Sequence, residues 1–116
     1  MKVAFIFGPG GANEDPAGVI SFYERNSEVR QAYDEVAGLS GIDVDVLLRK
    51  KDRQGDRNVA MVNFISLAAG MLGMHDALCA LDVSPSVIGG MSLGGMVGSC
   101  VASARPRPTL IDILQH

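Results

Sequence analysis

The chain has 116 residues, of which 47% are hydrophobic and 20% charged, and its net charge is −3. These values describe one globular domain or a piece of one. The acidic balance, with a pI near 5.2, argues against a surface that binds nucleic acid.

The first apolar segment, residues 3–7, predicts a buried parallel strand. It is too short for a signal peptide, so we expect a cytoplasmic location. Small residues fill the following loop, residues 8–13, at the end of the strand where open α/β sheets bind ligands. The loop lacks the lysine of a phosphate-binding loop, and Asn13 replaces the third glycine of a dinucleotide fingerprint. Its glycines would instead let a backbone amide approach a reacting atom.

An amphipathic helix is predicted next, capped at Asn26 or Ser27 and ending near Gly38. Apolar and other side chains alternate over residues 42–48, which is typical of a short half-buried strand. The charged stretch that follows mixes both signs and is interpreted as a solvated loop, residues 50–57.

Nearly every position from Val59 to Leu81 is apolar. Polar residues interrupt this stretch before any apolar run reaches the roughly 18 residues of a membrane span. We therefore predict a helix buried in a soluble domain, with no membrane contact. Cys79 and Cys100 lie in apolar helical patterns and are interpreted as reduced core residues, with no metal site. A last helix is predicted after a proline-rich break, with Thr109 as its cap.

The most informative stretch is the Gly-x-Ser-x-Gly pentapeptide Gly90–Gly94, which surrounds Ser92. A strand is predicted before it, over residues 86–89, and a buried helix after it, over residues 96–102. Such a pentapeptide also occurs by chance, but this context is that of a nucleophile elbow, where small neighbours fit a strained strand-to-helix turn. The amide of the residue after the serine would then face a developing oxyanion at the start of a helix.

These motifs resemble the N-terminal part of the malonyl-CoA:acyl-carrier-protein transacylases, the acyltransferases of fatty-acid and polyketide biosynthesis. Residues 7–13 stand in place of that family's Phe-Pro-Gly-Gln-Gly-Ser-Gln loop, and residues 90–95 in place of its Gly-His-Ser-Leu-Gly-Glu elbow. Residues 63–65 stand in place of its Gln-Pro-Ala motif. The resemblance implies an α/β fold: a parallel sheet flanked by helices, forming an incomplete α/β-hydrolase-like acyltransferase core. Residues 1–116 would be a partial large subdomain, with the small ferredoxin-like subdomain absent.

By the same resemblance, Ser92 is the catalytic nucleophile that carries the acyl group as an ester. The oxyanion hole would consist of the backbone amides of Gly10 and Leu93. A one-residue shift in the loop would put Gly11 in place of Gly10. Asn63 and Met91 would line the substrate site, where the family has a glutamine and a histidine. No cofactor and no metal are implied. We expect the first strand and the strand before the elbow to be parallel neighbours, so that both loops meet.

The implied reaction moves a malonyl or related acyl group from an acyl-coenzyme A to an acyl-carrier protein. The family's general-base histidine and carboxylate-binding arginine have no counterpart here. His75 would lie about 18 Å along one helix from Asn63, at about 1.5 Å per residue, which favours a structural role. His116 is the last residue. A second chain or a missing C-terminal segment would supply the base, so we expect this chain alone to be inactive and to expose apolar surface.

Two alternatives to the transferase stay open. The first is a serine acyl hydrolase of the same fold, with water as the acceptor of the acyl group. The second is a non-catalytic remnant or interaction subunit. A covalent serine probe would distinguish both enzymes from the remnant.

Overall fold

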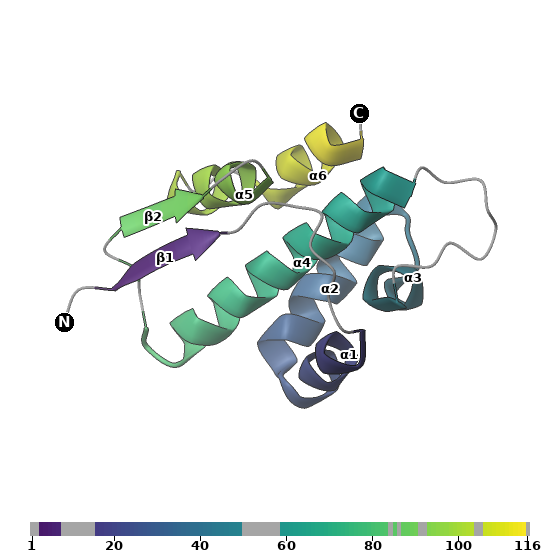
Figure 1. Cartoon of the computed structure of the whole chain (residues 1–116), viewed down its shortest axis with the longest axis horizontal. Helices are drawn as coiled ribbons and strands as arrows, with labels where there is room; N and C mark the ends of the chain where they lie inside the picture. Colours follow the sequence, from purple (N-terminus) through teal and green to yellow (C-terminus); the bar gives the residue numbers. More distant parts are fainter. Residues whose placement is uncertain are drawn as a thin grey trace.

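The computed structural model describes residues 3–7, 16–49, 59–83, 85, 87–90, 93–103 and 106–115. Within these stretches the elements follow the order β1, α1, α2, α3, α4, β2, α5 and α6 (Figure 1). Helices take up about 80% of this part, and its sheet has two strands. The predicted fold class, an α/β-hydrolase-like core, is therefore wrong, and the described chain is a small, mostly helical domain. A hydrolase-like core needs a wide parallel sheet, whereas most of the chain between the two strands is helical.

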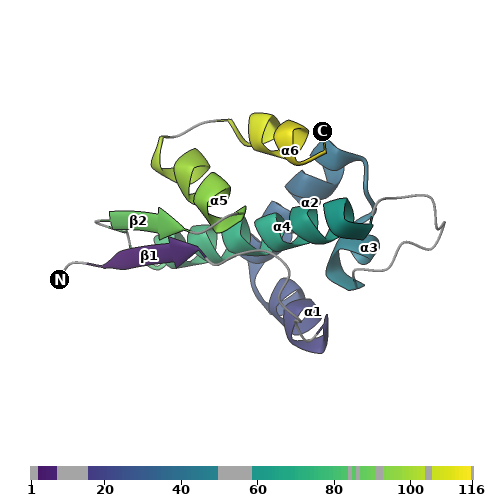
Figure 2. The same cartoon turned by 45° about the horizontal axis from the view of Figure 1, so that its top comes forward.

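The two strands, β1 (Ala4–Phe7) and β2 (Val87–Gly90), pair in parallel, with Phe7 opposite Gly90. This confirms the expected parallel pairing of the first strand with the strand before the elbow. The continuous apolar run of β1 does not reflect burial on both faces, since Phe5 is buried and Ile6 is 79% exposed. One face of the sheet is covered by α5, which packs against both strands (Figure 2).

The core is centred on the contact between α2 (Ser27–Ser40) and α4 (Val59–Ala80). As predicted, Asn26 caps α2, and its side-chain oxygen accepts a hydrogen bond from the Val29 amide at 3.0 Å. The helix ends slightly beyond the predicted residue, at Gly41, whose φ of 73° suits a residue without a Cβ. The buried side chains that α2 contributes to this core are Val29, Ala32, Tyr33 and Val36.

The long helix α4 is apolar on nearly all sides because it contacts α2, α3, α5 and α6. By length and composition, its segment Met61–Ala80 could cross a membrane, and 50% of that window is buried inside the structure. The predicted absence of membrane contact therefore stays a prediction. The side chains buried along α4 are Val62, Ile65, Ser66, Leu67, Ala68, Ala69, Leu72 and Ala77.

The predicted strand over residues 42–48 is wrong, because this segment contains the helix α3 (Val44–Arg49). Leu47 and Leu48 are both buried, which a strand with one covered face would not allow for adjacent residues. Ser66 ties α3 to α4 by donating a hydrogen bond from its hydroxyl to the Leu47 carbonyl. The sequence analysis did not predict α1 (Pro16–Arg25), which packs against α2 and α3.

The predicted helix after the elbow is α5 (Leu93–Ala102), which begins three residues earlier than expected. The final helix is α6 (Arg107–Gln115), so Thr109 lies within its first turn and not at the cap. Both helices lie on one side of α4, with α1 and α3 on the other (Figure 2). Arg107 holds α6 to the core by ion pairs with Asp76 of α4 at 2.7 Å and Glu35 of α2 at 3.1 Å.

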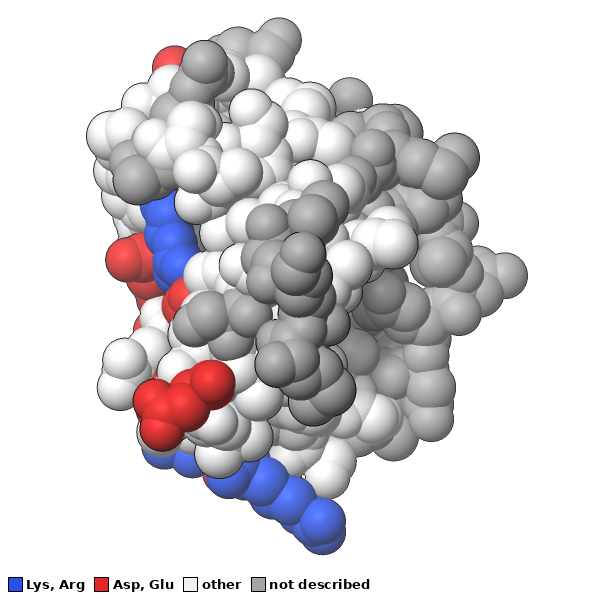
Figure 3. All heavy atoms as spheres, turned by 90° about the vertical axis from the view of Figure 1, so that its left-hand side faces the viewer, with Lys and Arg blue, Asp and Glu red and all other residues white. Residues whose placement is uncertain are grey.

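The surface is unevenly charged. On the face shown in Figure 3, charged side chains gather along one margin, and most other described atoms belong to uncharged residues. Among the described residues, exposed apolar side chains include Ile6, Leu81 and Ile113. Single exposed apolar side chains are common on protein surfaces, so the apolar surface expected of an incomplete unit stays a prediction.

Candidate functional site

The path of the chain around the elbow is a strand followed almost at once by a helix. Gly90 ends β2 and Leu93 begins α5, so Met91 and Ser92 alone separate them in sequence. Met91, Ser92 and Gly10 themselves lie outside the described residues. A strand that leads into a helix within two residues is the path that a nucleophile elbow requires.

Parallel pairing fixes where the two candidate loops leave the sheet. Because Phe7 lies opposite Gly90, the carboxyl ends of β1 and β2 share one edge, as the two arrowheads in Figure 1 show. Gly10 follows Phe7 by three residues and Ser92 follows Gly90 by two. The convergence of the Gly10 and Leu93 amides stays a prediction.

Leu93 is the first residue of the ten-residue helix α5, where backbone amides have no acceptor within the helix. Its role in an oxyanion hole stays a prediction. The helix dipole adds partial positive charge at this end, which favours an anion there. Small residues let α5 lie against β2, and the space of about 230 Å³ between them is lined by Ile88, Gly89, Gly95, Gly98, Ser99 and Ala102.

Asn63 lies near the start of α4, which is on the side to which both strand arrows point (Figure 1). Within the described part of the chain, its Oδ1 is the one buried side-chain nitrogen or oxygen atom without a hydrogen-bond partner. An unpaired buried acceptor costs about 1–3 kcal/mol, so this oxygen is suited to receive a donor from a bound molecule. The position agrees with the predicted substrate-lining role, which itself stays a prediction.

His75 lies on the C-terminal half of α4 and makes local contacts. Its Nδ1 is 3.3 Å from Oδ1 of Asp76, and its Nε2 is 3.6 Å from Sγ of Cys79. The ring packs edge-to-face on Phe5, with centroids 5.7 Å apart. Since both nitrogens face neighbours on the same helix, His75 is satisfied locally and is not placed as a base for Ser92. His116 lies outside the described residues.

A cavity that the sequence analysis missed lies between α5 and α6, with a volume of about 350 Å³. Its wall includes Gly95 and Met96, which follow Ser92 by three and four residues. The spacing of four residues between Gly95 and Ser99, and again between Thr109 and Ile113, is the signal that could have revealed it. Among the described residues, the lining has no charged side chain and consists of Gly95, Met96, Ser99, Cys100, Thr109, Leu110 and Ile113.

Neither cysteine forms a disulfide; Cys100 is buried in α5, as expected of a core residue, and Cys79 is half-buried in α4. In the described ranges, no three His, Cys, Asp or Glu side chains are grouped so that they could hold a metal ion.

Comparison with known proteins finds no matching family model, curated protein or solved structure. The functional argument therefore depends on the motifs and on the geometry around them.

Proposed function

We propose that this chain is the serine-bearing part of an acyltransferase that moves an acyl group from coenzyme A to an acyl-carrier protein. The observation that supports the proposal best is the path from β2 through Ser92 into α5, beside a parallel strand that leads to Gly10. The carboxyl ends of both strands share one edge of the sheet, which is where a nucleophile elbow and a glycine-rich loop would be expected to meet.

The proposed chemistry has two steps. The Ser92 hydroxyl loses its proton to a base and attacks the thioester carbonyl, and the carbon–sulfur bond then breaks to release coenzyme A as its thiol. In the second step, the thiol of the carrier attacks the Ser92 ester and regenerates the hydroxyl. The tetrahedral oxyanion of each step would accept hydrogen bonds from the amides of Gly10 and Leu93, and one such donor contributes about 10²–10³ in rate.

The surroundings favour an uncharged acyl group over malonate. The described lining of the α5–α6 cavity carries no charge, and its mixture of apolar groups with the hydroxyls of Ser99 and Thr109 suits an alkyl chain. The unpaired Oδ1 of Asn63 suits an N–H donor, and the pantetheine arm of an acyl-coenzyme A carries two amides.

The general base is proposed to come from outside this chain. In the described part, His75 is engaged with Asp76 and Cys79, so a second chain or a further segment has to supply an imidazole to Ser92. Exposed apolar side chains such as Ile6 and Leu81 would suit contact with it.

A fluorophosphonate probe tests the nucleophile. In the presence of a base-supplying segment, we expect it to label the natural chain and the Ser103→Ala control, and not Ser92→Ala. Ser103 is matched because it is exposed at the end of the same helix, outside the proposed site. Absence of labelling in the natural chain would favour the interaction subunit. Incubation with an acyl-coenzyme A, a carrier protein and a base-supplying segment then separates a transferase, which yields acyl-carrier, from a hydrolase, which yields free acid.

A further inference from the structure

Three side chains on one face of α4 form a carboxylate–imidazole–thiol series. His75 and Cys79 are four residues apart, which places them one turn apart on the same face. Asp76 Oδ1 lies 3.3 Å from Nδ1 of His75, and Cys79 Sγ lies 3.6 Å from Nε2 of the same ring. A carboxylate that orients an imidazole, which in turn faces a thiol, is the arrangement of an activated cysteine.

The tautomer of His75 follows from its partners. An ionised Asp76 can only accept a hydrogen bond, so it favours the tautomer with the proton on Nδ1, in which the lone pair of Nε2 faces the thiol. Asp76 is itself held by Arg107 at 2.7 Å, and Arg107 also contacts Glu35 at 3.1 Å. The pKa of Arg107 is raised above its ordinary value, chiefly by its hydrogen bond to Asp76, so it remains a cation.

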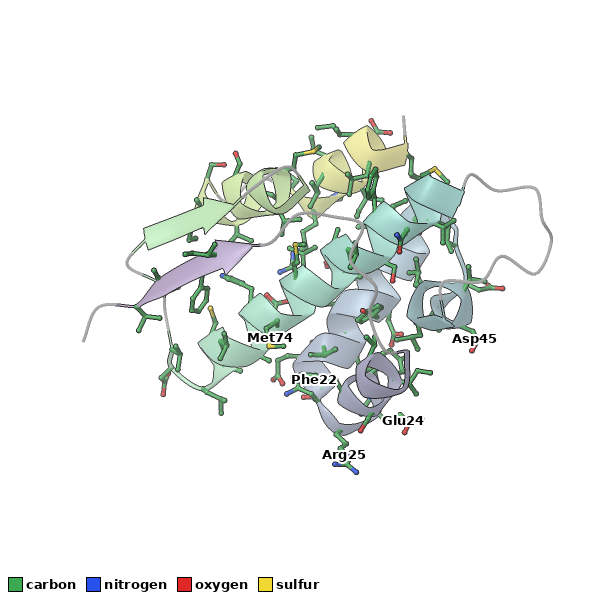
Figure 4. The ribbon with its side chains drawn as sticks, viewed as in Figure 1. Phe22, Glu24, Arg25, Asp45 and Met74 are labelled. Carbon is green, nitrogen blue, oxygen red and sulfur yellow. The ribbon has the colours of Figure 1, made fainter. Side chains whose placement is uncertain are left out.

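An apolar cavity of about 320 Å³ adjoins this series and lies between β1 and α4. His75 forms part of its wall, together with Ala4, Phe5, Ile6, Met71, Met74 and Leu78. Met74 is 44% exposed and lies close to Phe22 of α1 at the surface (Figure 4). A small apolar chain therefore has room beside the imidazole of His75, while Cys79 itself is not part of the described lining.

We propose that Cys79 is a second nucleophile of this chain, with His75 as its base and Asp76 as the residue that positions His75. The site takes an apolar acyl group from a thioester by thiol exchange. The Cys79 proton passes to Nε2 of His75, the thiolate attacks the thioester carbonyl, and the leaving thiolate recovers the proton from His75. One thioester is formed and one is broken, so no oxidant or further reactant is needed. This proposal does not depend on Ser92.

The chain supplies its own control thiol. Cys100 is 5% exposed and lies on α5, whereas Cys79 is half-buried beside His75. The variant Cys100→Ser leaves Cys79 as the single thiol, and Cys79→Ser leaves Cys100, because the sequence holds two cysteines.

Alkylation by iodoacetamide at pH 7 tests the activation. An ordinary thiol is only a few per cent thiolate at this pH, so pairing with a base can raise the rate roughly tenfold or more. We expect Cys79 in the Cys100→Ser chain to react about tenfold faster than in the chain that also carries His75→Gln or Asp76→Asn. Added imidazole should restore much of the rate to His75→Ala. Equal rates with and without His75, in variants that keep their circular dichroism, would overturn the proposal.

The rate should also depend on pH through this cluster. Within the described residues, the titratable groups that face His75 are Asp76 and Cys79, with Arg107 and Glu35 behind Asp76, and β1 presents only the ring of Phe5. We expect the alkylation profile of Cys79 to shift in Asp76→Asn, whereas a merely structural Asp76 would leave the profile unchanged.

Acyl transfer is tested with octanoyl-coenzyme A and acetyl-coenzyme A on the chain that carries Ser92→Ala and Cys100→Ser. We expect the mass to increase by one octanoyl group, which neutral hydroxylamine should remove because it is held as a thioester. Labelling by octanoyl-coenzyme A should be faster than labelling by acetyl-coenzyme A. Adding Cys79→Ser to this chain should abolish the acylation, and adding His75→Gln should slow the acylation about tenfold. Absence of acylation, or equal labelling of Cys100 in the Cys79→Ser, Ser92→Ala chain, would contradict the site.

Discussion

Gly73 lies where α4 meets α2, and a methyl group added there has almost no room. A Cβ at this position would lie 3.1 Å from the Cα of Val29 and 3.4 Å from each of that residue's methyl carbons. Val29 cannot move away easily, because its amide is held by the cap at Asn26. Gly38 is the matched control, since it lies within α2 and a Cβ there would meet nothing within 4 Å.

Both substitutions to alanine gain helix propensity, which stabilises by about 0.5–1 kcal/mol. We expect this gain in full for Gly38→Ala. For Gly73→Ala, overpacking against a backbone atom costs about 1–3 kcal/mol, so the two variants should differ by roughly that amount. Urea unfolding followed by circular dichroism, with equal m-values, measures the difference. If Gly73→Ala were stabilised as much as Gly38→Ala, the close contact between α2 and α4 would be refuted.

Three further predictions concern stability. Asn26→Ala removes the cap of α2 and should cost about 1 kcal/mol in urea unfolding, and no loss would contradict the capping assignment. Ile65→Val deletes one methyl group from a fully buried side chain and should lower the free energy of unfolding by about 0.5–1.5 kcal/mol. No measurable loss would show that the side chain is loosely packed. The pKa of Tyr23 is raised, chiefly by its hydrogen bond to Asp34, so this small stabilisation is complete below the ordinary pKa of 10.0 and is lost as pH rises through the raised value. Tyr23→Phe should flatten the fall in stability above pH 10, and an unchanged pH profile would show that the bond does not matter.

The sequence predicted those helices whose ends or apolar runs are determined by residues close together in the chain. The cap at Asn26 and the apolar stretch that forms α4 were both found, because a capping side chain and a long apolar run have few alternatives. The alternation over residues 42–48 was misread, because its period of two is that of a strand and does not mark one face of a helix, although the segment is helical. Tertiary contact decided the outcome, since Leu47 and Leu48 pack together into the core.

The fold class failed for a different reason. It was taken from motifs at the two strands, which do pair in parallel, and was extended over the chain between them. That intervening chain holds α1 to α4, and no motif there fixed its structure. A resemblance that depends on short loops therefore predicts the strands next to those loops, and it does not predict how many strands the whole sheet has.

The candidate site was predicted in part. The elbow needs only a strand, a serine and a helix in order, and a sequence displays that order directly. The α5–α6 cavity and the pair formed by His75 and Cys79 depend on which helix faces meet or align, so they became evident only with the helical register. A spacing of four between His75 and Cys79 in a predicted helix was the available signal.

The most direct test of the central proposal is to map the acyl group after the chain is incubated with excess octanoyl-coenzyme A. Because the base is supplied from outside, labelling should be slow, as expected when oxyanion donors act alone. Peptide mass spectrometry should find an ester on Ser92 that resists neutral hydroxylamine, distinct from any thioester on Cys79, and the ester should be absent in Ser92→Ala. An unmodified Ser92, even after addition of a base-supplying segment, would contradict the assignment of Ser92 as the acyl-carrying nucleophile.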